Sequence, residues 1–248
     1  MMGIQPNLLN QLVSLLLGAS VAGVLIFFMS SDGIGTEPST AGISSWVNGT
    51  MAVPVAPAQE QEANHTSASK VRLQQRILEL GYNFLFTDVD IMWFRNPFER
   101  MSVAAHMVTS SDFYFGDPYS PVNAPNTGFL YVRSSARMVG VFKAWRVARL
   151  SFPGKHEQQV FNEIKFELVD KRGLRVQFLD TVHNAGFCNN TRDFNTLYTM
   201  HANCCVGLAA KLHDLGNLMK EWRAYRGMDD AQRRSGPMRW KVPGICIH

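Results

Sequence analysis

The chain has 248 residues, of which 46% are apolar, so it can form one sizeable hydrophobic core. Its formal charge is +4, and its lysine and arginine residues are scattered without a dense basic run. This pattern excludes a typical nucleic-acid-binding surface, and we expect no nucleic acid among the partners of the protein.

The first strong feature in chain order is an uncharged apolar segment at residues 12–29. At about 1.5 Å per residue, a helix of this length just crosses the hydrocarbon core of a bilayer. We therefore predict a short cytoplasmic tail at residues 1–11, followed by a transmembrane signal anchor at residues 12–29. A cleaved signal peptide is the alternative, because Ser30 and Ser31 provide small residues near a potential cleavage point.

The next segment, residues 30–69, is rich in Ser, Thr, Ala, Pro, Gly and Gln and predicts a disordered stalk. Two Asn-x-Ser/Thr sequons fall in this stalk, at Asn48 and Asn64, and a third begins at Asn189. Such sequons also arise by chance, but together they favour a glycosylated body in the lumen of the secretory pathway.

The most informative stretch runs from Asn83 to Phe94, where Asp88 and Asp90 sit inside an apolar and aromatic run. In an extended strand, residues two apart share a face, so both carboxylates should point the same way as Phe84 and Phe86. Two carboxylates at the rim of a sheet repel each other unless a cation joins them. The stretch therefore predicts a divalent metal site that faces an anionic ligand, for which we expect a diphosphate.

Apolar periodicity around this stretch alternates between the helix and the strand pattern. Helical spacing predicts helices at residues 70–80, 136–150, 156–169 and 208–225. Strands are predicted at residues 128–133 and 174–179, and shorter apolar runs lie at residues 103–108 and 197–200. This alternation predicts an α/β layer fold.

The four cysteines are Cys188, Cys204, Cys205 and Cys246. In an oxidising lumen they can form disulfides in three different pairings. Adjacent cysteines seldom bond to each other, so we expect Cys188 to pair with Cys204 or Cys205. A zinc site is the rival interpretation, which the lack of a C-x-x-C pair disfavours.

The stretch from Phe84 to Phe98 resembles the signature of the plant nucleotide-diphospho-sugar transferase domain, within glycosyltransferase family 77. Later blocks match the same family in the same order, at residues 126–129, 157–162, 178–180, 200–205 and 240–243. The match extends from about Val71 to the end of the chain.

The resemblance implies a GT-A-like, Rossmann-like nucleotide-diphospho-sugar transferase fold in a single-pass type II protein of the Golgi membrane. It implies transfer of a sugar from a nucleotide-diphosphate donor, for which we expect a UDP-sugar, to a glycan or glycoprotein acceptor of a plant cell wall. It further implies retention of the anomeric configuration and Mn²⁺ or Mg²⁺ as the cofactor. No catalytic residue can be assigned from the sequence.

The resemblance also suggests site residues beyond the two acids. His201 would be a third metal ligand, although a structural histidine is the simpler interpretation. Apart from the resemblance, Lys211 lies in the first turn of a predicted helix, where it would contact the diphosphate with the help of the helix N-terminus, although a solvated lysine is the alternative interpretation. The remaining candidates for donor contacts are Asn126, Thr127, Gly128, Glu157 and Gln158, with Asp112 and Asp180 as further acids.

The chain departs from the family pattern at one place. In the family, several βα units precede the Asp-x-Asp strand and build the nucleotide pocket, whereas here the stalk leads directly to Lys70. Residues 70–248 would then be a partial catalytic domain with an exposed sheet edge and weak binding of a UDP-sugar.

Two alternatives remain open at this point. An inactive, truncated relative could act as a binding or assembly partner. A phosphohydrolase of the haloacid dehalogenase type also begins with an Asp-x-Asp strand, and Asp229 and Asp230 could then act as its downstream acids.

Overall fold

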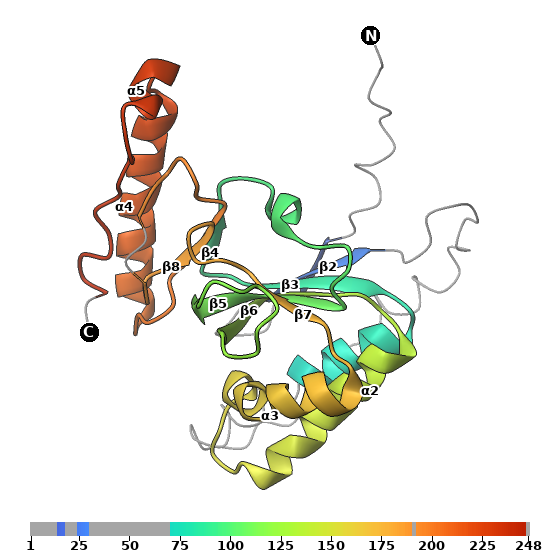
Figure 1. Ribbon diagram of the computed structural model, residues 1–248. Helices are drawn as coiled ribbons and strands as arrows, with labels where there is room; N and C mark the ends of the chain where they lie inside the picture. Colours follow the sequence, from blue (N-terminus) through green and yellow to red (C-terminus); the bar gives the residue numbers. More distant parts are fainter. Residues whose placement is uncertain (1–13, 18–23, 30–69, 190–191, 247–248) are drawn as a thin grey trace.

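The computed structural model describes residues 14–17, 24–29, 70–189 and 192–246 (Figure 1). The predicted tail at residues 1–11, the predicted stalk at residues 30–69, and Asn48 and Asn64 lie outside the described residues. Within the described residues, strands and helices form a mixed α/β structure, which confirms the predicted fold class.

A six-stranded sheet with the order β1-β2-β3-β6-β5-β7 forms the centre of the molecule. Its strands are β1 (Ser14–Leu17), β2 (Val24–Met29), β3 (Asn83–Asp88), β5 (Met107–Phe113), β6 (Ala124–Val132) and β7 (Val176–Phe178). β6 is antiparallel to both β3 and β5, and β5 is parallel to β7. The carboxyl ends of β3, β5 and β7 therefore lie at one rim, together with the start of β6.

Part of the segment predicted to be a transmembrane helix, residues 12–29, forms strands instead. β2 pairs antiparallel with β3 along its whole length, from Val24 opposite Asp88 to Met29 opposite Asn83. Short apolar runs fit either structure, and pairing supplies partners for the N–H and C=O groups that an edge strand leaves open. β2 therefore covers the edge of β3, and β1 is the edge strand on this side of the sheet. No helix among the described residues combines the length and the apolar character needed to cross a membrane.

Three helices pack on one face of this sheet, namely residues 70–79, α2 (Ala136–Ala148) and α3 (Glu157–Arg172) (Figure 1). α2 begins where the Ser135 side chain accepts a hydrogen bond from the Met138 N–H. α3 ends at Gly173, which has a φ of 60°. The buried residues between the helices and the sheet include Phe84, Phe86, Phe142, Trp145 and Phe161.

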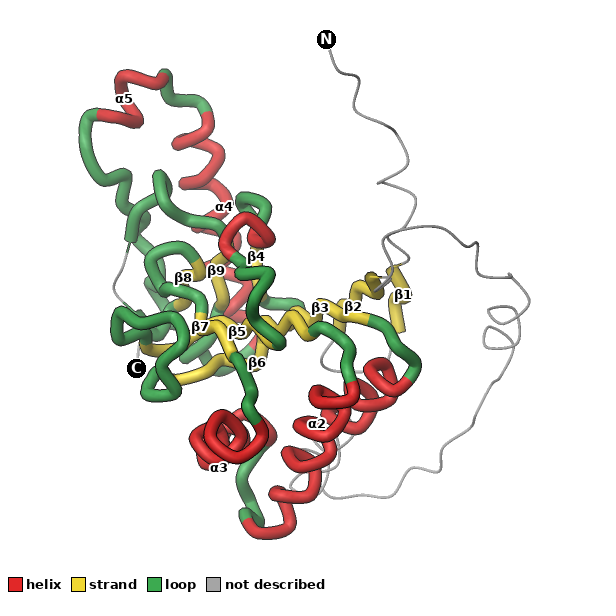
Figure 2. The backbone as a smooth tube through the Cα atoms, turned by 45° about the vertical axis from the view of Figure 1, so that its right-hand side comes forward, coloured by secondary structure: helices red, strands yellow, loops and turns green. Residues whose placement is uncertain are grey.

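A second, three-stranded sheet with the order β4-β9-β8 lies beside the first (Figure 2). It consists of β4 (Ile91–Trp93), β8 (Asn184–Gly186) and β9 (Thr199–His201). Helix α4 (Leu208–Arg226) packs against it through Leu218, Trp222 and Tyr225, and the short helix α5 (Asp230–Arg234) follows. Two short 3₁₀ helices, η3 (Pro97–Arg100) and η4 (Arg149–Ser151), complete the elements.

The sequence predicted one strand in the stretch from Asn83 to Phe94, but the structure contains two. β3 ends at Asp88, a turn follows, and β4 begins at Ile91 in the other sheet. The apolar run continues across the turn because β3 is largely buried and Ile91 and Met92 of β4 are half-buried, so the pattern alone does not mark the break. The two acids consequently lie at the junction of the two sheets, with Asp90 in the turn.

Candidate metal and donor site

The two acids and His201 are brought together by strand pairing. β4 pairs antiparallel with β9, which places Ile91 opposite His201. The Ala202 N–H donates to the Asp90 carbonyl over 3.0 Å and closes this ladder at the turn. Asp88 at the end of β3, Asp90 in the turn and His201 at the end of β9 therefore converge, although they come from three separate elements.

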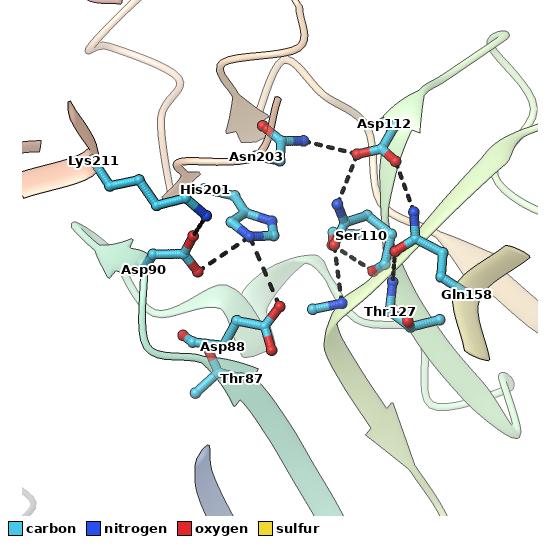
Figure 3. Close-up of polar contacts among 12 residues, drawn as sticks. Thr87, Asp88, Asp90, Ser110, Asp112, Thr127, Gln158, His201, Asn203 and Lys211 are labelled. Carbon is cyan, nitrogen blue, oxygen red and sulfur yellow. Dashed lines mark hydrogen bonds and ion pairs between the residues drawn. The ribbon is translucent and has the colours of Figure 1, made fainter. Parts of the chain in front are cut away.

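The side chains of these three residues face one another (Figure 3). His201 Nε2 lies 3.3 Å from Asp90 Oδ1 and 3.9 Å from Asp88 Oδ2. One potential ligand atom from each residue lies within 4.8 Å of the other two. Two carboxylate oxygens suit both Mn²⁺ and Mg²⁺, and the imidazole nitrogen favours Mn²⁺ because Mg²⁺ prefers oxygen ligands. The residues present therefore fit Mn²⁺, one of the two metals that the sequence suggested.

Positive charges flank this set on both sides. Lys211 Nζ lies 2.6 Å from Asp90 Oδ2, and Lys70 Nζ lies 4.0 Å from Asp88 Oδ1. Burial alone would raise the pKa of Asp90, but the hydrogen bonds and charges of His201 and Lys211 outweigh it and lower this pKa to about 2. In contrast, burial raises the pKa of Asp88 despite the opposing charges of Lys70 and His201. Asp90 is thus stabilised as an anion and Asp88 is not.

A second polar cluster surrounds Asp112, next to the acids and His201 (Figure 3). Asp112 Oδ1 accepts hydrogen bonds from Asn126 Nδ2 and Asn203 Nδ2, both over 2.7 Å. Its Oδ2 accepts from Gln158 Nε2 over 2.9 Å, and Gln158 Oε1 in turn accepts from the Thr127 N–H over 3.0 Å. A single carboxylate therefore orients three side-chain amides at the rim of the sheet.

Gly128 connects the metal candidates to this cluster. Its N–H donates to Asn126 Oδ1 over 2.9 Å. A Cβ atom at this position would lie 2.5 Å from Asp88 Oδ2 and 2.7 Å from His201 Cε1. Only a glycine lets the β6 backbone approach these two side chains so closely.

Glu157 at the start of α3 is turned toward Lys70 rather than toward the Asp112 cluster. Lys70 Nζ lies 3.1 Å from Glu157 Oε1 and also donates to the Thr127 carbonyl over 3.4 Å. The candidate Asp180 caps a turn by accepting from the Val182 N–H, and it takes no part in either cluster.

Two residues of the site were not anticipated. Lys70 appeared in the sequence only as the first residue of a helix, and Asn203 only as part of a matching block. The signal for Asn203 is its place two residues after His201, beside Cys204. The Cys188 N–H donates to Asn203 Oδ1 over 3.2 Å, so the loop that holds this amide is itself cross-linked.

The structure pairs Cys188 with Cys204, which is one of the two partners that we expected for it. The second disulfide joins Cys205 to Cys246 and was not specified by the sequence. Residues 190 and 191, which complete the sequon that begins at Asn189, lie outside the described residues.

Comparison with known proteins adds independent findings. A family model described as nucleotide-diphospho-sugar transferase matches residues 46–215. Two uncharacterised Arabidopsis thaliana proteins, At4g15970 and At1g28695, are 37% and 35% identical over 69% and 63% of this chain, covering 44% and 47% of their own lengths. The Arabidopsis thaliana beta-arabinofuranosyltransferase RAY1 is 32% identical over 45% of this chain and 23% of its own length.

The chain thus spans about half the length, or less, of the curated relatives it matches. Among solved structures, a glycosyltransferase involved in the glycosylation of the major capsid of PBCV-1 matches 67% of this chain and 81% of its own, with a TM-score of 0.43 and 14% identity.

Proposed function

Because the chain belongs to the nucleotide-diphospho-sugar transferase family, we propose that it transfers a sugar from a UDP-sugar to a glycan or glycoprotein, using Mn²⁺ or Mg²⁺. The observation that carries this proposal is the convergence of Asp88, Asp90 and His201 at the rim of the sheet. Carboxyl ends of strands in α/β sheets are where such ligands bind. Family membership also makes the phosphohydrolase alternative unnecessary.

The proposed cation would be held by Asp88, Asp90 and His201, and it would neutralise the charge that develops on the leaving diphosphate. Lys211 lies in the first turn of α4, where the helix N-terminus also favours an anion. With Asp90 engaged by a cation, the ammonium group of Lys211 would be available to the diphosphate. Lys211 thus has two alternative anionic partners, Asp90 and the diphosphate.

The Asp112 cluster supports a role in holding the donor sugar. Asn126, Gln158 and Asn203 are fixed by hydrogen bonds to one carboxylate. Amides held in this way do not have to be ordered when a hydroxyl-rich ligand binds, which lowers the entropy cost of binding. Retention at the anomeric carbon remains a proposal that rests on the family.

We further propose that the protein works in the lumen of the Golgi apparatus, on a plant cell-wall or glycoprotein acceptor. Two disulfides support this location, because disulfides persist in oxidising compartments and are rare in the cytosol. Weak binding of a UDP-sugar remains a prediction of the sequence.

The test is hydrolysis or transfer of a panel of UDP-sugars by the full chain, secreted from a eukaryotic host, with and without Mn²⁺. We expect a metal-dependent release of UDP that the double variant Asp88→Asn, Asp90→Asn abolishes. Glu167→Gln is the matched control, because Glu167 forms an exposed ion pair with Lys171 on α3. Release of UDP that is equal in the double variant and the wild type would refute the proposed function.

A further inference from the structure

A small polar cavity lies beside His201. It is separate from the contacts that the Nε2 atom of His201 makes with Asp88 and Asp90. Ser111 from β5, Asn184 from β8 and His201 from β9 all line it. Each of the three residues has one buried polar atom that finds no hydrogen-bond partner among the described residues. These atoms are Ser111 Oγ, Asn184 Oδ1 and His201 Nδ1.

Buried polar atoms without a partner are rare, because each costs on the order of 1–3 kcal/mol. Three of them on the wall of one cavity indicate a shared partner rather than three separate defects. The cavity has room for a single water molecule, and buried waters typically make about three hydrogen bonds to such groups. Its polar lining, which includes Asn126 and Asn203, fits a water rather than a dry void.

We propose that one buried water bridges His201 Nδ1, Asn184 Oδ1 and Ser111 Oγ, and that Ser111 and Asn184 are positioning residues for His201. The inference rests on the proposed metal site, since it assigns these residues a role toward the ligand atom His201 Nε2. Histidines that bind metals usually donate their second N–H to such a partner, which fixes the tautomer and the orientation of the ring.

The directions of the hydrogen bonds follow from contacts already present. Asn184 Nδ2 donates to Thr199 Oγ1 over 2.8 Å, which turns Asn184 Oδ1 into the cavity as an acceptor. The water therefore donates one hydrogen to Asn184 Oδ1, whereas the Ser111 hydroxyl can either accept from the water or donate to it. With a cation on Nε2, the ring proton lies on Nδ1, which then donates to the water oxygen, and Ser111 Oγ accepts the second hydrogen of the water. Without a cation, Nε2 lies 3.3 Å from Asp90 Oδ1 and can itself carry the ring proton, so the water is the feature common to both states.

The first test is ¹⁵N NMR of the histidine-labelled protein without metal, with the His201 signals assigned through a His201→Asn variant. The proposal predicts a contact between the His201 ring and a long-lived water. The absence of such a water would overturn the proposal. This result does not depend on metal binding, so it stands apart from the fate of the proposed function.

The second test is Ser111→Val, which fills the cavity with a methyl group and displaces the water. We expect the water contact to disappear and the affinity for Mn²⁺ to fall roughly 10–100-fold, as for other groups that support metal-binding histidines. Ser110→Ala is the matched control. Ser110 Oγ donates to the Asn126 carbonyl, and this carbonyl still accepts a hydrogen bond from Thr109 Oγ1 in the variant. We expect this control to retain both signals.

Unchanged Mn²⁺ affinity and an unchanged Nδ1 signal in Ser111→Val would contradict the proposal. If this variant does not fold, Ser111→Ala keeps the test open, because it removes one partner of the water without adding volume. In that variant the contact between the ring and the water should weaken. A wild-type protein that binds no Mn²⁺ would refute the metal site, whereas the water contact would still decide the bridging water.

Discussion

Lys211 Nζ lies 2.6 Å from Asp90 Oδ2, so the first turn of α4 places a cation directly on one acid of the Asp-x-Asp pair. The Asp90 side chain is 16% exposed and the Lys211 side chain 28% exposed, which shields their attraction from solvent only in part. In the absence of a metal ion, the lysine supplies a positive charge where the metal ion would otherwise supply it.

This contact predicts opposite effects of Lys211→Met on two ligands. Affinity for Mn²⁺ should rise, because Asp90 no longer has to exchange an ion pair for the cation. Affinity for UDP in the presence of Mn²⁺ should fall, because the diphosphate loses a cationic partner. Calorimetry on both ligands measures the two effects. Lys220→Met should change neither affinity, because Lys220 lies on the same helix and, among the described residues, its side chain donates only to Asn217 Oδ1.

The close approach of Gly128 predicts that Gly128→Ala disrupts the site. A Cβ atom there would collide with Asp88 Oδ2 and His201 Cε1, and both side chains would have to move away from their shared position. We expect Mn²⁺ affinity to fall at least tenfold, as measured by calorimetry. The control is Gly140→Ala in α2, where nothing lies within 4 Å of the added Cβ. Wild-type affinity in Gly128→Ala would show that the approach has no role in metal binding.

The two acids of the motif should affect stability in opposite directions. Burial raises the pKa of Asp88, so its ionised form costs stability near pH 7, and Asp88→Asn should slightly raise the unfolding temperature. The rise is small because the Asp88 side chain is 37% exposed. Asp90→Asn should lower the unfolding temperature, since it removes the partner of Lys211 and His201.

The pH dependence follows from the same values. The pKa of Asp90 falls from 3.8 to about 2 on folding, so its stabilising contribution is complete above 3.8 and is lost as the pH falls through about 2. The difference in unfolding temperature between wild type and Asp90→Asn should therefore shrink over that range. Thermal unfolding without metal measures it. A difference that grows on acidification would contradict the assigned pKa shift.

Asp214 predicts a stability effect away from the site. Its fully buried carboxylate accepts hydrogen bonds from the backbone N–H groups of Gly244, Ile245 and Cys246, at distances of 3.0, 3.1 and 2.8 Å to Oδ2. Burial would raise the pKa of Asp214, but these bonds and that from His213 outweigh it and lower the pKa. Asp214→Ala should cost on the order of 3 kcal/mol in the free energy of unfolding, because the three N–H groups lose their acceptor. Chemical denaturation measures this loss.

Asp230→Ala provides the control for Asp214→Ala. Asp230 belongs to α5 and forms only exposed ion pairs with Arg233 and Arg234. Pairs of this kind contribute little, so we expect a change of less than about 1 kcal/mol. Equal losses in the two variants would mean that the buried hydrogen bonds of Asp214 do not hold the C-terminal segment.

The helices and the acidic pair could be predicted from the sequence because their signals are local. The helix at residues 70–79, α2, α3 and α4 each follow an apolar periodicity that lies within one segment. Asp88 and Asp90 stood out because carboxylates are rare inside a buried aromatic run. Such signals need no knowledge of what packs against the segment.

The remaining features depend on contacts between distant segments. The break between β3 and β4 is set by pairing with two different sheets, and β8 (Asn184–Gly186) is too short to show a pattern. The grouping of amides around Asp112 requires the register of β5 with β6 and the start of α3. The apolar segment at residues 24–29 fits a helix as well as a strand, and its antiparallel pairing with β3 cannot be read from composition.

The most direct test of the metal site is titration of the purified protein with Mn²⁺, followed by electron paramagnetic resonance of the free ion. The account predicts one tight site per chain in the wild type and in Glu167→Gln. It predicts that this site is lost in the double variant Asp88→Asn, Asp90→Asn and strongly weakened in His201→Asn. A tight site that survives in the double variant, or none in a folded wild-type protein, would contradict the account.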